Sequence, residues 1–191
     1  FRSVMLAKGN RSKQVTNACA IFEQRNGIFN NWRRDAKAAE REFGVPVPVM
    51  MATIYTESAF RPYARPPRTK LLGFIPWKRQ STAYGYAQAL DGTWGVYQRE
   101  TGRWSASRTD FTDAIHFVGW YHHRSSQKNG IALNDGYNLY LAYYAGHAGY
   151  ERGEFTSGIR GAAQLLETSN GGSDAALACS LVASQSRCSA P

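Results

Sequence analysis

The feature that most constrains the fold is an apolar run over residues 46–60, which predicts a helix with a single carboxylate near its far end. Pro46 and Pro48 open the run, and proline is tolerated in the first turn of a helix, where its missing N–H would be unpaired anyway. The residues at helical spacing that lead up to Glu57 are Val49, Met50, Thr53 and Ile54. We therefore expect Glu57 to extend one broad, buried face.

A carboxylate on a buried face has chemical consequences. Burial disfavours the charged form, so we expect a raised pKa for Glu57 and a proton available for donation near neutral pH. This is the property of a general acid. On spacing alone, the commoner alternative is that Glu57 caps a helix end or forms a structural ion pair.

Three short motifs follow one another along the chain: Glu57-Ser58, Gly85-Tyr86-Ala87-Gln88 and Ala142-Tyr143-Tyr144-Ala145-Gly146. In this order they resemble the lytic transglycosylases of the soluble, lysozyme-like (SLT) type, whose motifs run Glu-Ser, Gly-Leu-Met-Gln and Ala-Tyr-Asn-Ala-Gly. Each motif is weak alone, but their order and spacing over residues 45–150 make the resemblance specific. The sequence segments at residues 67–79 and 83–94 are similar to those of a lipoprotein subgroup of that family.

The resemblance implies an enzyme that cleaves the β-1,4 bond between N-acetylmuramic acid and N-acetylglucosamine in peptidoglycan without water, and leaves 1,6-anhydromuramic acid ends. Glu57 would act as acid and then as base. Glycosidases commonly use two carboxylates, but one is sufficient when the substrate's own N-acetyl group assists. Asp91, the nearest acidic residue in the second motif, is more typical of a helix cap than of a catalyst.

The motif match assigns substrate contacts to five further residues: Ser58, Tyr86, Gln88, Tyr143 and Tyr144. Gln88 can both donate and accept hydrogen bonds, which suits an N-acetyl group. Tyr144 stands where the family has asparagine, which puts that contact in doubt, and the neighbouring His147 is a candidate replacement. A tyrosine-rich segment also brings hydroxyls that a dry core would struggle to satisfy, so some of them should face a polar site.

The fold class that we predict is mainly α, a single lysozyme-like (goose-type, SLT) domain with an inserted loop beside the cleft. The boundaries are a flexible basic lead-in over residues 1–17 and one domain over 18–191, and 191 residues are enough for a sizeable core. The loop, residues 61–80, mixes basic and aromatic residues that suit sugar stacking and stem-peptide carboxylates, although a hydrophobic flap over the core fits equally well.

Further helices are expected elsewhere in the chain. Asn31 to Phe43 is helix-forming and is followed by Gly44, and Asp110 is a plausible cap for a helix from Phe111 to about Lys128. A turn followed by a helix is expected over residues 83–99, a tyrosine-rich helix over 136–146, and short helices over 160–167 and 174–185.

The charge balance predicts a polyanionic partner, because 23 Lys and Arg exceed 14 Asp and Glu by nine. The basic residues are scattered and no nucleic-acid-binding motif is present, but charge alone does not choose between nucleic acid and a bacterial wall with its peptide carboxylates and anionic polymers. The family resemblance implies that the partner is peptidoglycan glycan strands and no nucleic acid. An alternative is a catalytically weak or inactive peptidoglycan-binding component of an envelope or secretion machine. The retained Glu57-Ser58 pair argues against that alternative, because a pure binder would not need the carboxylate.

No window is apolar enough to span a membrane, and we expect an exported, periplasmic or envelope monomer with a possible lipid anchor upstream. Three cysteines, Cys19, Cys179 and Cys188, lie near the two ends; one pair could form a disulfide, and three buried thiols fit as well. We expect no cofactor and no metal. His116 and His122 face apart on a helix, and we interpret them as surface or satisfied core groups.

Overall fold

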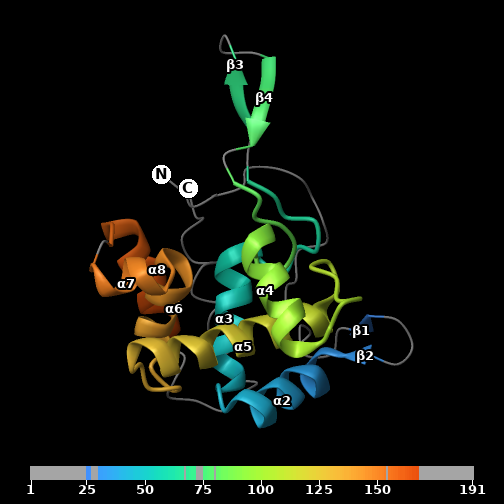
Figure 1. Ribbon diagram of the computed structural model, residues 1–191, viewed down its shortest axis with the longest axis vertical. Helices are drawn as coiled ribbons and strands as arrows, with labels where there is room; N and C mark the ends of the chain where they lie inside the picture. The colour runs from blue at the N-terminus through green and yellow to red at the C-terminus, as the bar shows by residue number, and fades with distance from the viewer. Residues whose placement is uncertain are drawn as a thin grey trace, which may run out of the picture.

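The computed structural model describes residues 25–26, 30–66, 68–71, 75–79, 81–153 and 155–167, which form a mainly helical body with two short antiparallel strand pairs (Figure 1). The predicted mainly α, lysozyme-like fold class is confirmed. The lead-in over residues 1–17, the helix over 174–185 and the three cysteines lie outside the described residues, so those predictions stay predictions. The helices are α2 (Trp32–Phe43), α3 (Val47–Ser58), α4 (Asp91–Thr101), α5 (Phe111–Asn129), α6 (Gly136–Ala145), α7 (His147–Glu151) and α8 (Ser157–Glu167).

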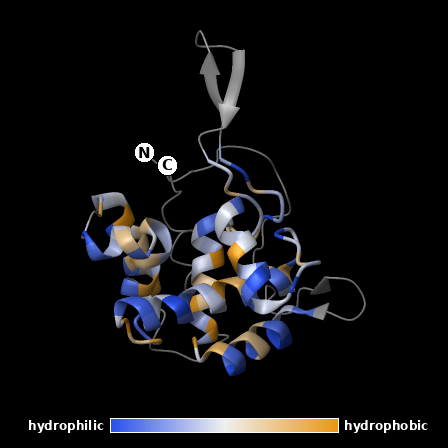
Figure 2. Cartoon of the chain, in the orientation of Figure 1, coloured by the Kyte–Doolittle hydropathy of each residue, from blue (hydrophilic) through white to orange (hydrophobic). Residues whose placement is uncertain are grey.

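Helix α2 is an amphipathic surface helix with clear start and stop signals. The side chain of Asn31 accepts hydrogen bonds from the backbone N–H groups of Arg33 at 2.9 Å and Arg34 at 3.3 Å. The helix ends at Gly44, whose φ of 72° suits a residue without a side chain. Hydrophilic residues occupy the outer positions of the helix (Figure 2). The buried residues follow helical spacing and are Trp32, Asp35, Ala36 and Ala39.

Helix α3 differs from its prediction. We expected one buried face, but every residue from Val47 to Ile54 is buried. The reason is its position: α3 packs against α2, α5 and α8, so it has no solvent side along most of its length. A helix that is apolar all round belongs inside a domain. Exposure begins only in the last turn, where Glu57 is half-buried.

Helix α5 is the second central element. The Asp110 side chain accepts the backbone N–H of Asp113 at 3.2 Å and caps the helix as predicted. The helix then packs against α2, α3, α4, α6 and α7. The larger hydrophobic cluster forms around α3 and α5, and a smaller one joins α3 to α6 and α8 through Ala52.

The inserted stretch forms regular structure, which corrects the expectation of a loop. Strands β3 (Arg68–Leu71) and β4 (Ile75–Arg79) pair antiparallel and project away from the helices (Figure 1). Strands β1 (Arg25–Asn26) and β2 (Asn30–Asn31) form the other pair. The helix predicted over residues 160–167 begins earlier, at Ser157. Within the described residues, none of the helices combines the length and apolarity needed to cross a bilayer.

Candidate active site

Glu57 lies in the last turn of α3, at the point where the helix leaves the core. Two successive residues with positive φ end the helix, Ala59 at 49° and Phe60 at 56°. Neither is glycine, and such backbone costs energy unless the surroundings hold it. The Phe60 ring packs against Trp32 and Tyr55, with centroids 5.7 and 5.9 Å apart, which fixes this turn beside the carboxylate.

Tyr140 of α6 reaches Glu57 directly. Its hydroxyl donates a hydrogen bond of 3.1 Å to Oε1 of the carboxylate. Tyr140 is only 3% exposed, and burial, together with the charge of Glu57, holds the pKa of its hydroxyl well above the ordinary value. The hydroxyl therefore keeps its proton and remains a donor that orients the carboxylate. The raised pKa expected for Glu57 itself stays a prediction.

Ser58 turns back into its own helix. Its hydroxyl donates to the carbonyl of Ile54 at 3.1 Å, and the residue is 2% exposed. The Ser58 carbonyl accepts hydrogen bonds from the backbone N–H of Arg61 at 3.1 Å and from Arg61 Nε at 3.0 Å. Ser58 thus anchors the turn after Glu57, and its contact with substrate stays a prediction.

The second motif is a tight turn in which Gly85 is sterically required. A Cβ at Gly85 would lie 2.0 Å from the carbonyl oxygen of Arg108, and the residue has a φ of 79°. Its N–H donates to the carbonyl of Ala64 at 3.1 Å, which joins the turn to the segment after Glu57. The N–H of Tyr86 donates to the same Arg108 carbonyl at 3.1 Å. These hydrogen bonds hold the motif between the segment that carries Ala64 and the segment that carries Arg108.

Gln88 closes the same turn through its side chain. Its Nε2 donates to the carbonyls of Ala64 and Gly85, both at 2.8 Å, and its own backbone has a φ of 49°. Both amide protons therefore have partners inside the protein, and the acceptor oxygen is the group left for an N-acetyl N–H. The predicted contact of Gln88 with substrate would thus use only its side-chain oxygen.

Tyr86 lies in the core. Its ring makes edge contacts with Trp32 and Phe111 at 5.7 and 5.8 Å between centroids, and the residue is 5% exposed. Burial raises the pKa of its hydroxyl to about 12, with smaller contributions from Asp110 and Tyr63. A substrate contact would have to reach the hydroxyl edge, and this role stays a prediction.

The two tyrosines of the third motif face different neighbours. The Tyr143 hydroxyl donates to the carbonyl of Ala87 at 2.6 Å, so α6 is joined to the second motif. Its ring also packs edge-on against Tyr121, 5.0 Å away. Tyr144 packs instead with the smaller hydrophobic cluster on α6 and α8. His147 stacks on Tyr121 at 4.8 Å, the ring that also contacts Tyr143, and its replacement of the family asparagine stays a prediction.

Helix α6 therefore connects all three motifs. Tyr140 bonds to Glu57 of the first motif, and Tyr143, one turn further along, bonds to Ala87 of the second. We did not predict Tyr140 from the sequence. The available signals were its place three residues before Tyr143 on a tyrosine-rich helix and the need of buried hydroxyls for partners.

Comparison with protein families agrees with this arrangement. A family model described as Transglycosylase SLT domain matches residues 3–171. The chain belongs to this family. It is therefore a member of the soluble-type lytic transglycosylases, peptidoglycan-binding lyases with a lysozyme-like fold, as the motifs indicated. Neither the comparison with curated proteins nor that with solved structures found a match, and the lipoprotein subgroup stays a prediction.

The histidines of the SLT domain have structural surroundings. His116 bonds to Tyr97 and Glu42, and the Nε2 of His122 lies 2.9 Å from the hydroxyl of Thr53. Among the residues that the structure describes, no group of three or more His, Cys, Asp or Glu side chains could hold a metal ion. His122 is not fully satisfied, because its Nδ1 is buried without a partner in the described part of the chain. The expectation of a satisfied core histidine is wrong for this atom.

Proposed function

We propose that this SLT domain cleaves the β-1,4 bond between N-acetylmuramic acid and N-acetylglucosamine without water and leaves a 1,6-anhydromuramic acid end. Glu57 is the single catalytic carboxylate. The observation that carries the proposal is the hydrogen bond of 3.1 Å that Tyr140, on the helix of the third motif, donates to Glu57. It supports a carboxylate held in one orientation at a half-exposed position, where a substrate can reach it.

The reaction begins with proton transfer. Protonated Glu57 donates to the glycosidic oxygen while the N-acetyl oxygen of the muramic acid attacks C1, so the glycosidic bond breaks and N-acetylglucosamine leaves with its hydroxyl. The Glu57 carboxylate then accepts the proton of the 6-hydroxyl, and O6 attacks C1 and displaces the N-acetyl oxygen. Atoms balance with no water consumed, and Glu57 ends protonated as it began.

A single carboxylate is consistent with the surroundings of Asp91. Asp91 lies in the first turn of α4 and forms an ion pair of 2.7 Å with Arg108. Arg108 also donates to the carbonyls of Thr82 and Ala89 at 3.3 and 3.0 Å. Asp91 thus has a structural role in holding the second motif, which supports substrate assistance in place of a second catalytic carboxylate.

The binding roles follow from the same contacts. Gln88 offers its acceptor oxygen to an N-acetyl N–H, and Tyr143 fixes the loop that carries Gln88 through Ala87. Ser58 supports the turn behind Glu57. The hydroxyl edge of Tyr86 and the side chain of Tyr144 are the proposed contacts with the sugars. On this proposal the enzyme acts on glycan strands in the periplasm or cell envelope, and we propose that it does so as a monomer.

Mass analysis of muropeptides released from purified peptidoglycan tests the proposal. Wild type should release anhydromuropeptides, and Glu57→Gln should lower their rate of release by about a thousandfold, within the range for loss of a general acid–base. Reducing ends in place of anhydro ends would identify a lysozyme-type hydrolase. No release by wild type, with binding to peptidoglycan retained, would identify a non-catalytic binding domain.

A further inference from the structure

Arg65 is an exposed cation held in a fixed place next to the second motif. Its guanidinium carbon lies 3.8 Å from the centre of the Tyr84 ring, a distance typical of a strong stacking contact. Tyr84 precedes Gly85 and is fixed by its bridge to Ala89. The preceding carbonyl, of Ala64, receives hydrogen bonds from Gly85 N and Gln88 Nε2. The backbone and the side chain of Arg65 are therefore both tied to the turn that carries Gln88.

Among the described residues, no acidic neighbour neutralises the charge of Arg65. Arg108, the other cation near the Tyr84 ring at 5.6 Å, differs in this respect because it pairs with Asp91. An oriented guanidinium without an acidic partner is suited to bind a carboxylate of a ligand.

The surroundings match a peptide better than a bare sugar. Tyr63, two residues before Arg65 in the chain, is 74% exposed and offers an apolar surface on the same segment. Arg61 is also exposed and holds the turn after Glu57 through its bond to the Ser58 carbonyl. One segment, residues 58–65, thus runs from the proposed catalytic residue to the charged and aromatic side chains. Stem peptides, which start from muramic acid, carry both carboxylates and methyl groups.

From this arrangement we infer that Arg65, stacked on Tyr84, binds a stem-peptide carboxylate, so that the enzyme acts preferentially on peptide-bearing glycan. The inference rests on the proposed function for the identity of the substrate, and its test measures binding separately from turnover. A muramic acid held at Gln88 would extend its peptide along residues 63–65. Arg65 would then bind the peptide while Glu57 acts on the sugar.

Binding is measured in the full chain carrying Glu57→Gln, which leaves the substrate intact. The two ligands are soluble glycan strands with stem peptides and the same strands after an amidase has removed them. Addition of Arg65→Gln should weaken binding of peptide-bearing strands about tenfold, the effect of one charge-assisted contact, and should not change binding of stripped strands. Arg65→Lys keeps the charge but not the planar stack, and should restore part of the loss.

Arg160 provides a matched control. It is an exposed arginine whose guanidinium carbon lies 5.8 Å from the Phe155 ring, on α8. Arg160→Gln should not change the preference for peptide-bearing strands. Amidation of the peptide carboxylates should remove the preference for peptide-bearing strands in the protein with unchanged Arg65. This experiment changes only the ligand, so the fold of the protein is untouched. It also distinguishes binding of peptide carboxylates from binding of phosphate groups in attached polymers.

Three results would overturn the inference: equal affinity for peptide-bearing and stripped strands, an equal loss for both strands in Arg65→Gln, or a preference that survives amidation. The second would mean that Arg65 only supports the 84–88 turn. Because binding is read in the Glu57→Gln background, each arm has an outcome even if wild type releases no anhydromuropeptides. That failure would count against the proposed function alone.

Discussion

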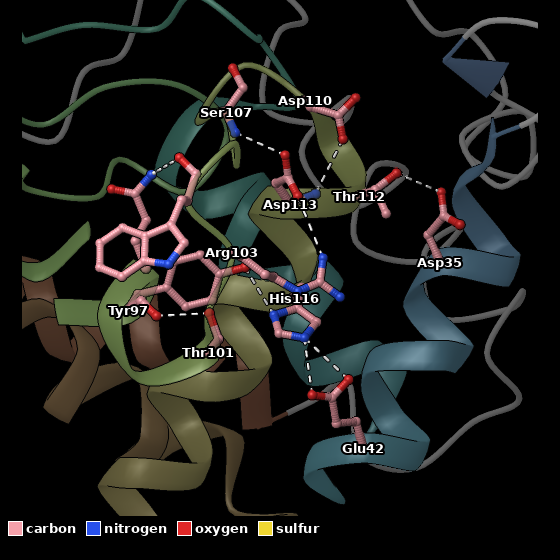
Figure 3. A network of polar contacts seen from close by, with 12 residues as sticks. Asp35, Glu42, Tyr97, Thr101, Arg103, Ser107, Asp110, Thr112, Asp113 and His116 are labelled. Carbon is pink, nitrogen blue, oxygen red and sulfur yellow. Dashed lines mark hydrogen bonds and ion pairs between the residues drawn. The ribbon is translucent and has the colours of Figure 1, made fainter. Parts of the chain in front are cut away.

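Tyr140 and Tyr97 each hydrogen-bond to an ionisable group, and the two regions in which they lie differ in exposure. Tyr140 donates to Glu57 at the end of α3, where the carboxylate is half-exposed. Tyr97 lies 2.9 Å from Nδ1 of His116, whose Nε2 is 3.1 Å from both oxygens of Glu42 (Figure 3). His116 is only 5% exposed and has partners on both nitrogens. The first region leaves its carboxylate partly exposed, as the proposed catalytic role requires, whereas the second joins α2, α4 and α5.

The exposure and partners of each group distinguish the proposed reactive site from a stabilising network. His116 donates through Nε2–H to Glu42 and accepts the Tyr97 hydroxyl at Nδ1, so both ring nitrogens are used within the fold. Burial, followed by the charge of Arg103, lowers the pKa of His116, while Glu42 acts in the opposite direction. Burial thus favours the neutral ring, and both nitrogens of His116 are engaged within the fold. Substitutions in the two regions should therefore affect different measurements.

The largest difference should come from the two carboxylates. Glu57→Gln should reduce the rate of muropeptide release by about a thousandfold, because the general acid is lost, with little change in melting temperature. Glu42→Gln is the matched control and should leave the rate unchanged while lowering the free energy of unfolding by about 1 kcal/mol. Similar rate losses in both variants would remove the distinction between the regions.

A second effect should follow from removal of the Tyr140 hydroxyl. Tyr140→Phe should lower kcat about 30-fold, because a hydrogen bond to a charged group contributes about 2 kcal/mol. The alkaline limb of the pH–rate profile should also move to higher pH, since the donor that favours the ionised carboxylate is gone. A lower melting temperature with an unchanged kcat and profile would instead make Tyr140 a purely structural residue.

The corresponding change in the other region should affect stability. Tyr97→Phe leaves Nδ1 of His116 buried without its donor, and should lower the free energy of unfolding by about 1.5 kcal/mol in denaturant titrations. The rate of muropeptide release per folded molecule should match wild type. If kcat falls as much as in Tyr140→Phe, the network around His116 is coupled to the active site. The distinction between a reactive and a stabilising region would then be wrong.

The smallest effect concerns the pH dependence of stability that arises from His122, a histidine buried in the core. Burial lowers the pKa of His122 to about 3, below the ordinary value of 6.5, so the unfolded state binds more protons between these values. Stability from this residue is therefore complete above about pH 6.5 and falls as pH decreases. From about pH 6 to pH 5, wild type should lose about 1 kcal/mol more than His122→Gln in urea titrations. Equal losses would mean that His122 titrates as an exposed histidine.

Helix ends with local signals could be predicted from the sequence. Asn31, Gly44 and Asp110 end or start helices where expected, because capping depends on a few neighbouring atoms. The hairpin β3–β4 was missed, since Pro76 and several basic residues obscure strand alternation. The single buried face of α3 was wrong because neighbouring helices cover all its sides, which local spacing does not reveal.

The candidate site was predictable in its motifs and not in its contacts. Glu57 follows from the motif order, but its partner Tyr140 is 83 residues away and comes into contact only through the packing of α6. The use of both Gln88 amide protons depends on the Ala64 carbonyl, which belongs to another loop. Tyr86 lies in the core because Trp32 and Phe111 meet its ring, a tertiary contact with no local signal.

The central claim is that Glu57 allows the sugar to close on itself without water, and digestion in water enriched in heavy oxygen tests it most directly. Muropeptides released by wild type should be anhydro products with no heavy oxygen at C1 of muramic acid, and Glu57→Gln should release almost none. Products that carry heavy oxygen at C1 with free reducing ends would contradict the account, because they would show that water, not the 6-hydroxyl, attacks that carbon.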